Sequence, residues 1–248
     1  MVKNMSQDEV IKSFLSFLLP ISLILCALES KAQENKIETT ISAEVVSQYI
    51  WRGQDLGNVS LQPTLGISYK GFSLNACGSV GLSEPSDNKE IDITLNYTAG
   101  GFNIGLTDYW TNSGSDTRSR YFKYGAHETN HVFEANIGYD FNFAAIQLYT
   151  NFAGDDGVGN NDKRAYSSYF EASAPFCLGG IDWTATAGVV PYATDFYDVN
   201  GFSVTNLSLT ASKEIKITDK FSLPIYASFV SNPQSQKAYF VFGMTFEP

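Results

Sequence analysis

Apolar and polar residues alternate along most of the chain after residue 37. Within residues 90–99, isoleucine, leucine, tyrosine and alanine occupy the odd positions, whereas polar residues occupy the even ones. Residues 237–246 repeat the pattern, with phenylalanine or methionine at four alternate positions. A period of two residues predicts β-strands and not helices, because successive side chains of a strand point to opposite faces.

The alternation predicts twelve strands in a single domain. Their expected ranges are 38–52, 61–70, 72–82, 90–99, 102–111, 131–140, 143–153, 165–176, 181–190, 202–213, 221–230 and 237–246. The spacing runs through this region without a linker, so we expect no second domain.

The connections between the strands alternate in length. Short turns rich in Gly, Asn and Asp, which adopt the positive φ of tight hairpins, are expected at 70–71, 100–101, 141–142, 178–180 and 218–220. Longer polar loops are expected at 53–60, 83–89, 112–130, 154–164, 191–201 and 231–236. All the long loops therefore lie at one end, as in transmembrane barrels with short periplasmic turns, long extracellular loops and an even strand number.

The polar faces of the strands favour a membrane barrel over a soluble barrel or sandwich. Serine, threonine and asparagine dominate these faces, as expected for the wall of a lumen. Twelve strands also enclose more space than one layer of apolar side chains fills. We therefore predict an all-β fold, a transmembrane antiparallel β-barrel of about 12 strands; a secreted soluble β-protein is the alternative.

The N-terminal segment has the pattern of a cleaved signal peptide. An apolar run over residues 14–28 is followed by Ser30-Lys31-Ala32, with small residues at the positions that a signal peptidase reads. The run is short for a membrane span. We predict a signal peptide over 1–32, cleaved after Ala32, and a barrel over 33–248.

The charge balance argues against a nucleic-acid partner. The chain has a formal net charge of −10, and residues 1–32 carry three acidic and three basic residues, so cleavage leaves this value unchanged. Nucleic-acid binding needs clusters of Lys and Arg that this sequence lacks. We also expect no metal or other cofactor.

Aromatic residues concentrate near both ends of the predicted strands. Near the loop end lie Trp51, Tyr109, Trp110, Tyr121, Phe122 and Tyr124; near the short-turn end lie Phe72, Phe102, Phe141, Phe176 and Phe221. Such belts are typical of membrane interfaces. The last strand ends in Phe246, which is similar to the signal read by bacterial barrel-assembly machinery. We expect a protein of the Gram-negative outer membrane, in contact with lipid and lipopolysaccharide.

The segment SQYIWRGQDLG, from Ser47 to Gly57, precedes Gln62-Pro63. This region resembles the opening motif of the TorF-type porins, bacterial outer-membrane proteins of poorly defined function. The residues that carry the resemblance are Ser47, Tyr49, Trp51, Arg52, Gly53 and Pro63. The resemblance implies an outer-membrane location and suggests a pore, and it names no substrate.

Strand alternation predicts which side chains line the lumen. These candidates are Glu44, Gln48, Arg52, Asp92, Asn96, Tyr109, Glu134, Asn136, Tyr149, Tyr169, Glu171, Asp182 and Tyr226. Five of them are acidic and one is basic, which predicts a mild preference for cations. The bulky Tyr and Arg side chains predict a narrow channel.

Arg52 has two interpretations. It is a constriction cation that attracts anionic groups of a solute, or it pairs with an inward carboxylate such as Glu44 or Glu171 and holds the first strand. We favour the second interpretation, because a single Arg among several acidic residues is better explained as the ion-pair partner of one of them than as a selectivity filter.

Two further groups of residues are candidate sites. His127 and His131, with Thr129 between them, lie near the rim, where some outer-membrane lipid hydrolases place a His and a Ser; we favour a structural role. The loop 154–164 is rich in Asp and Asn, which are possible Ca²⁺ ligands, but its spacing is not that of an EF-hand, and we favour an ordinary solvated loop.

Our prediction is an outer-membrane, porin-like narrow channel for passive diffusion of small hydrophilic solutes or ions. The alternative is a non-conducting structural or adhesive barrel that binds a partner through its extracellular loops. A lipid-hydrolysing barrel comes third, and we expect no enzyme activity. The sequence leaves the oligomeric state open.

Overall fold

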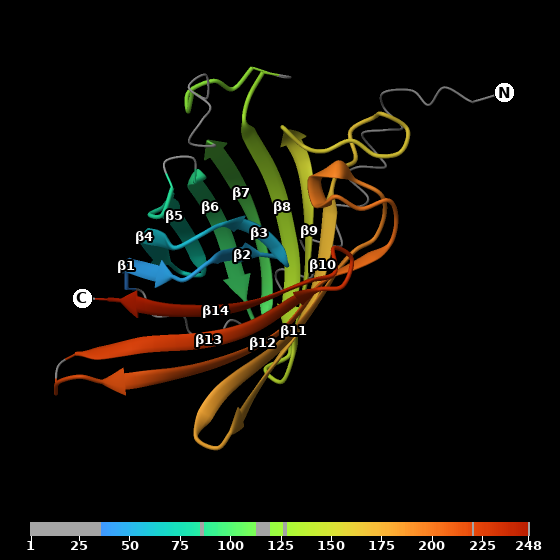
Figure 1. Cartoon of the computed structure of the whole chain (residues 1–248). Coiled ribbons are helices and arrows are strands. Elements are labelled where there is room, and N and C mark those ends of the chain that lie inside the picture. Colours follow the sequence, from blue (N-terminus) through green and yellow to red (C-terminus); the bar gives the residue numbers. More distant parts are fainter. Residues whose placement is uncertain (1–35, 85–86, 113–119, 126–127, 220, 248) are drawn as a thin grey trace. The chain divides into compact units, whose positions relative to one another are not determined.

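The computed structural model describes residues 36–84, 87–112, 120–125, 128–219 and 221–247 (Figure 1). Twelve antiparallel strands form a closed barrel, in which the last strand, β14 (Lys237–Phe246), pairs with the first, β1 (Glu38–Val46). The predicted all-β, twelve-stranded antiparallel barrel is thus confirmed. The predicted signal peptide, 1–32, lies outside the described residues.

The wall strands follow one another around the barrel in chain order. After β1 they are β4 (Ser60–Tyr69), β5 (Phe72–Gly81), β6 (Lys89–Ala99), β7 (Phe102–Asn112), β8 (His131–Asp140), β9 (Ala145–Gly154), β10 (Ser168–Leu178), β11 (Ile181–Val190), β12 (Ser203–Lys216), β13 (Ser222–Asn232) and β14. Among the described residues the helical element is η1 (Asp195–Tyr197), a three-residue 3-10 turn, and none of their helices is long and apolar enough to cross a membrane.

The first strand is shorter than predicted. We expected a strand over 38–52, but β1 ends at Val46, which pairs directly with Ser60 of β4. The chain between these two residues forms a separate hairpin of β2 (Tyr49–Trp51) and β3 (Gln54–Gly57). Strict alternation is interrupted at Val45-Val46 and Ser47-Gln48, close to the end of β1. The prediction ran past this point because Tyr49, Ile50 and Trp51 favour strands and do form one, β2.

The outer face of the barrel is apolar and exposed. Leu65 and Phe240 are each 59% exposed, and Leu106 is 51% exposed. The opposite, inward faces carry buried polar residues instead, such as Thr205 at 0% and Glu134 at 2% exposure. This distribution is the reverse of that in a soluble protein, whose large apolar side chains are mostly buried.

The tight turns have the backbone geometry that their residues predict. Positive φ angles occur at Lys70 (48°) and Gly71 (84°), and again at Gly100 (55°), Gly101 (84°) and Asn142 (70°). Gly and Asn adopt this region at low cost, which explains why these residues separate the strands.

Glycines on the inward faces leave room for large side chains of adjacent strands. A Cβ atom at Gly188 would lie 1.8 Å from the hydroxyl of Tyr169, and one at Gly243 would lie 2.2 Å from the ring of Tyr226. Both tyrosines therefore lie flat along the wall, where they reduce the width of the lumen less than upright rings would.

Candidate functional site

The β2–β3 hairpin leaves the wall and runs across the inside of the barrel (Figure 1). Its tip is formed by Arg52 and Gly53, with φ angles of 51° and 80°. A Cβ atom at Gly53 would lie 1.8 Å from the carbonyl oxygen of Thr205 on β12, so only glycine fits this approach. The Nδ2 of Asn232 on β13 also donates to the carbonyl oxygen of Gly53, at 3.1 Å.

An ion pair joins the hairpin tip to the opposite wall. Arg52 Nη1 and Nη2 donate to the two carboxylate oxygens of Glu134 on β8, at 2.6 and 2.9 Å. The side chains of the pair are 7% and 2% exposed. Tyr109 donates its hydroxyl proton to the same carboxylate, at 3.0 Å, and Arg52 Nη1 also donates to the hydroxyl of Tyr197, at 2.7 Å. Such a bidentate, charge-assisted contact fixes both position and orientation.

Three aromatic rings surround the Arg52 guanidinium. Its Cζ lies 4.0 Å from the ring centroid of Tyr149, 4.2 Å from that of Trp51 and 4.9 Å from that of Tyr169. Aromatic faces attract cations at these distances, and more strongly where water is excluded. The hairpin tip is therefore held by charge, hydrogen bonds and ring contacts together.

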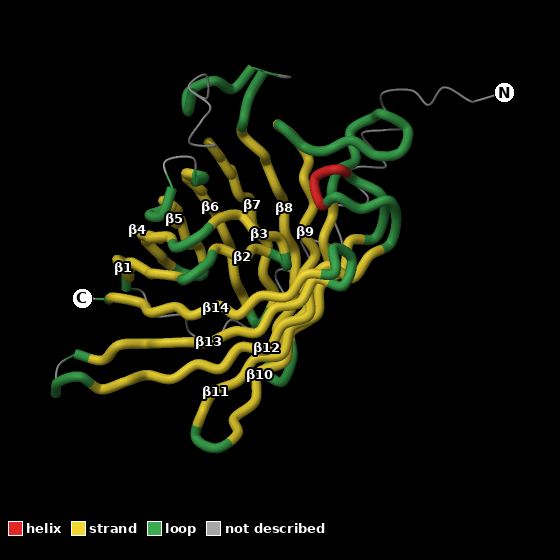
Figure 2. Tube along the Cα trace, viewed as in Figure 1, coloured by secondary structure: helices red, strands yellow, loops and turns green. Residues whose placement is uncertain are grey.

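The loop between β11 and β12 closes around the hairpin from the loop end, where Figure 2 shows η1 in red. Tyr197 stacks on Trp51, with ring centroids 6.1 Å apart. Tyr197 also belongs to a small buried cluster with Tyr169, Val190 and Val199. Two inserted segments, the hairpin and this loop, thus narrow the lumen near its loop end.

A cavity of about 190 Å³ remains between the hairpin and strands β6 to β8. It is lined by Trp51, Gln54, Leu56, Asn88, Glu90, Tyr109, Thr111, Val132 and Phe196. Glu90 is only 8% exposed, and its carboxylate accepts a hydrogen bond from the Tyr49 hydroxyl, at 2.9 Å. A cavity of this size holds several water molecules.

Two of the residues predicted to line the wall are not on it. Gln48 lies in the segment that leads into the hairpin, where it is half-buried and its Nε2 donates to a carboxylate oxygen of Asp55, at 3.0 Å. Arg52 lies at the hairpin tip and pairs with Glu134, not with Glu44 or Glu171. Both differences follow from the early end of β1.

The remaining predicted residues lie on the strand faces opposite the exposed apolar side chains. They are Glu44 on β1, Asp92 and Asn96 on β6, Tyr109 on β7, Glu134 and Asn136 on β8, Tyr149 on β9, Tyr169 and Glu171 on β10, Asp182 on β11 and Tyr226 on β13. Many of them contact one another: Tyr226 donates to Glu44 at 2.6 Å, and Tyr169 donates to Glu171 at 2.7 Å.

Sequence reasoning missed three residues of the site. Glu90 shares the strand face of Asp92, so the alternation itself contained its signal. Tyr197 lies in a loop, where no periodicity indicates a position. Trp51 was expected in an interfacial belt, but it packs inside the barrel against Tyr109 and Tyr197.

His131 lies on the outward face of β8 and is completely buried. Its Nδ1 is 2.7 Å from an oxygen of Asp108, and its Nε2 is 2.6 Å from the carbonyl oxygen of Tyr121. Tyr124 stacks on the ring at 4.2 Å. Both ring nitrogens are thus engaged, and the contacts attach residues 120–125 to the outer wall. His127 lies outside the described residues.

Two carboxylates hold the Asp-rich loop 154–164 in place, one from Asp156 in the loop and one from Asp195 in η1. Asp156 accepts hydrogen bonds from the backbone N–H of Ser167 and from Nδ2 of Asn151, at 3.2 and 3.1 Å. Asp195 accepts one from the backbone N–H of Val158, at 2.6 Å. Burial raises the pKa of Asp155, and the negative charge of Asp195 adds to this effect. Within the described ranges, no three His, Cys, Asp or Glu residues gather as metal ligands do.

No protein-family profile matches the chain, and no curated protein matches it. One solved structure, from the work "Unveiling the Mechanism Behind the in-meso Crystallization of Membrane Proteins", is similar over 84% of this chain and 83% of its own, with 8% identity and a TM-score of 0.38. A score this low does not establish a common fold.

Proposed function

We propose that the protein is a channel of the Gram-negative outer membrane, narrowed near its loop end by the β2–β3 hairpin. The observation that carries the proposal is the reversed polarity of a closed barrel, with exposed apolar side chains outside and polar side chains inside. In hydrocarbon a sheet must close on itself, because open edges leave backbone groups unpaired. The sequence resemblance to the TorF-type porins supports the same location.

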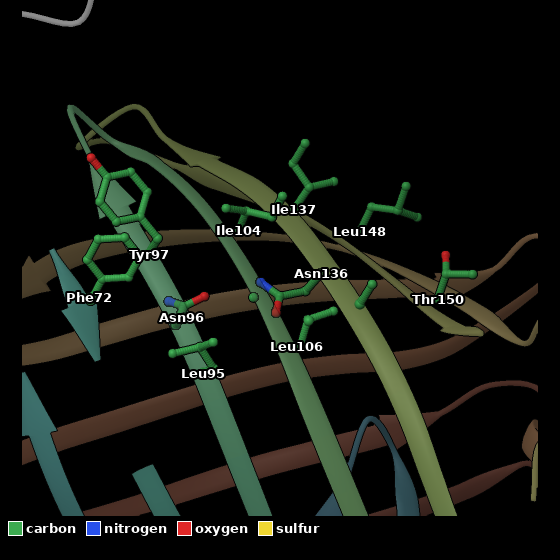
Figure 3. A pocket seen from close by; sticks show the side chains of 12 residues that line it. Phe72, Leu95, Asn96, Tyr97, Ile104, Leu106, Asn136, Ile137, Leu148 and Thr150 are labelled. Atoms are coloured by element: carbon green, nitrogen blue, oxygen red, sulfur yellow. The ribbon is translucent and has the colours of Figure 1, made fainter. Parts of the chain in front are cut away.

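The outer wall suits contact with lipid chains. An apolar hollow of about 530 Å³ lies over β6 to β9 (Figure 3). Leu95, Ile104, Ile137 and Leu148, from four successive strands, line it, and each is at least 40% exposed. Lipid and lipopolysaccharide are the partners that such a surface predicts, and Phe246, 42% exposed at the end of β14, suits recognition by barrel-assembly machinery.

The lumen suits small hydrophilic solutes or ions. Near the middle of the strands, its wall carries hydroxyl side chains that pair across strands, such as Thr94 with Thr107 at 3.1 Å and Thr210 with Ser228 at 2.8 Å. Because Glu134 neutralises Arg52, the other inward carboxylates leave the lumen acidic. The channel should therefore prefer cations mildly, with a reversal potential on the cation side under a salt gradient.

The hairpin offers a direct test of conduction. Val46 and Ser60 face each other on adjacent strands, so an Asn-Gly turn in place of residues 47–59 closes the wall without the hairpin. We expect this variant, folded into a planar bilayer, to conduct several-fold more than the wild type. The control places the same turn between Asn232 and Lys237, which also face each other, and should leave conductance unchanged.

The same recording separates the alternatives. A folded hairpin-free barrel that passes no current would contradict the channel and favour a structural barrel that binds through its loops. A lipid hydrolase would instead release fatty acid from phospholipid in detergent. His131 is a poor general base for that reaction, since both of its ring nitrogens are already engaged.

A further inference from the structure

The surroundings of the Arg52 guanidinium have the composition of a receptor for an organic cation. Glu134 supplies a carboxylate with both oxygens engaged, Tyr149 and Tyr169 supply ring faces, and Tyr197 supplies a hydroxyl acceptor. We call these four residues the cation cage. A carboxylate for the N–H groups and aromatic faces for the planar cation are how proteins bind guanidinium and methylated ammonium groups.

The cage belongs mainly to the barrel and not to the hairpin that occupies it. Glu134, Tyr149 and Tyr169 come from β8, β9 and β10, which are adjacent in the wall. Wall contacts orient them without the hairpin: Tyr109 donates to Glu134, and Tyr169 is held between Asn206 and Glu171. The hairpin contributes Arg52 itself and one further ring, that of Trp51.

The cavity beside the hairpin lies next to the cage. Trp51 and Tyr109 line this cavity, and Trp51 also contacts Arg52, whereas Tyr109 contacts Glu134. The buried carboxylate of Glu90 lines the same space. A cation in the lumen therefore meets negative charge beside the place where the arginine is bound.

We propose that the cation cage is a binding site for guanidinium-type organic cations in the lumen, and that Arg52 is a tethered occupant that competes with them. This inference rests on the proposed channel function and specifies its solute class. A guanidinium suits the cage better than a metal ion, because ring faces offer a metal ion no lone pairs. It suits the cage better than a primary ammonium, because a planar fork matches both oxygens of Glu134.

The test removes the tethered cation and supplies a free one. Purified Arg52→Ala protein, folded in detergent, is titrated with methylguanidinium and with methylurea, a neutral molecule of similar shape, by calorimetry. We expect the variant to bind methylguanidinium roughly ten-fold more tightly than methylurea. The wild type should bind methylguanidinium more weakly than the variant does, because the free cation must displace Arg52. The matched control, Arg52→Ala with Glu134→Gln, should lose the preference. Equal affinity for both solutes in the Arg52→Ala variant would overturn the proposal.

Arg52→Ala leaves Glu134 buried without a partner, so folding of the variant is itself informative. If the variant folds poorly, the refolding yield, read from heat-modifiable migration in gels, should rise with methylguanidinium and not with methylurea. If neither solute restores folding, the proposal that the cation cage binds guanidinium-type cations is wrong. Binding without any current through the hairpin-free barrel would overturn the channel and leave the cage standing, so the two failures are distinguishable.

Discussion

Arg52 and Glu134 lie 82 residues apart in the chain, and the guanidinium of the first makes two hydrogen bonds, of 2.6 and 2.9 Å, with the carboxylate of the second. This contact joins a hairpin inserted between two neighbouring wall strands to the far wall of the barrel. The position of the hairpin thus depends on a buried charge pair, and not only on the backbone.

Glu134→Gln should lower the free energy of unfolding by about 3 kcal/mol, because it leaves a buried arginine without a counter-charge. Arg52→Ala should cost a similar amount, for the converse reason. In the double variant the free energy of unfolding should fall by much less than the sum of the two single losses, since no buried charge remains unpaired. Urea unfolding in lipid vesicles, followed by tryptophan fluorescence, measures all three; additive losses would show that the two residues do not act as a pair.

Gly53→Ala should displace the hairpin tip from β12. Its Cβ would lie 1.8 Å from the carbonyl oxygen of Thr205, and its φ of 80° is itself unfavourable for alanine. We expect a lower midpoint of thermal unfolding and a larger single-channel conductance. Gly57→Ala, in the same hairpin with open space around it, is the control and should change neither. Similar behaviour of the two variants would contradict the close approach at Gly53.

Gly188→Ala should push the Tyr169 ring away from the wall, since the new Cβ would lie 1.8 Å from its hydroxyl. The hydroxyl would lose its bonds to Glu171 and Asn206, at a cost of about 1–3 kcal/mol for the buried groups left unpaired. Chemical denaturation in detergent measures this loss. Gly78→Ala, where the nearest atom is 3.5 Å away, should be close to neutral, and an equal loss there would point to a general intolerance of alanine.

Asp108→Asn should loosen residues 120–125 from the outer wall. The carboxylate of Asp108 holds His131, whose other nitrogen contacts the carbonyl oxygen of Tyr121. We expect faster cleavage by trypsin after Arg120 and Lys123 in the folded protein, read by mass spectrometry. Asp219→Asn, which removes the exposed ion pair with Lys216, is the control. Unchanged cleavage in Asp108→Asn would mean that other contacts hold the segment.

Asp155→Asn should change how stability depends on pH. Burial and the charge of Asp195 raise the pKa of Asp155 in the folded protein, so its stabilising contribution is present at low pH and is lost as the pH rises through the raised pKa. The Asp155→Asn protein has no carboxyl group at this position, so its stability does not fall in this way as the pH rises. Thermal unfolding of both proteins from pH 4 to pH 8 should show the variant gaining relative to the wild type as the pH rises, by a small amount because the loop is solvated. A difference in thermal stability between the two proteins that stays constant from pH 4 to pH 8 would contradict the raised pKa of Asp155.

Much of the barrel wall could be predicted from the sequence, because the alternation of apolar and polar residues within a strand shows which side chains share a face. The range predicted for the last strand, 237–246, and that predicted for 181–190 agree with β14 and β11. The tight turns predicted at 70–71 and 100–101 also agree with the structure, because the positive φ angles they need depend on the turn residues themselves. The turn predicted at 141–142 is longer, since β9 begins only at Ala145. The inward positions of Asp92, Glu134 and Tyr169 follow from the same alternation.

The sequence by itself therefore determined the number of wall strands, the alternating loop lengths and, within the wall strands, the face on which the predicted lumen residues lie, since these depend on neighbours a few residues away. Only the tertiary structure decided that residues 47–57 enter the lumen, that Arg52 pairs with Glu134 and that Tyr197 closes over both. Those contacts join residues far apart in the chain. They depend on how the closed barrel sets the distance between its walls, which no local pattern encodes.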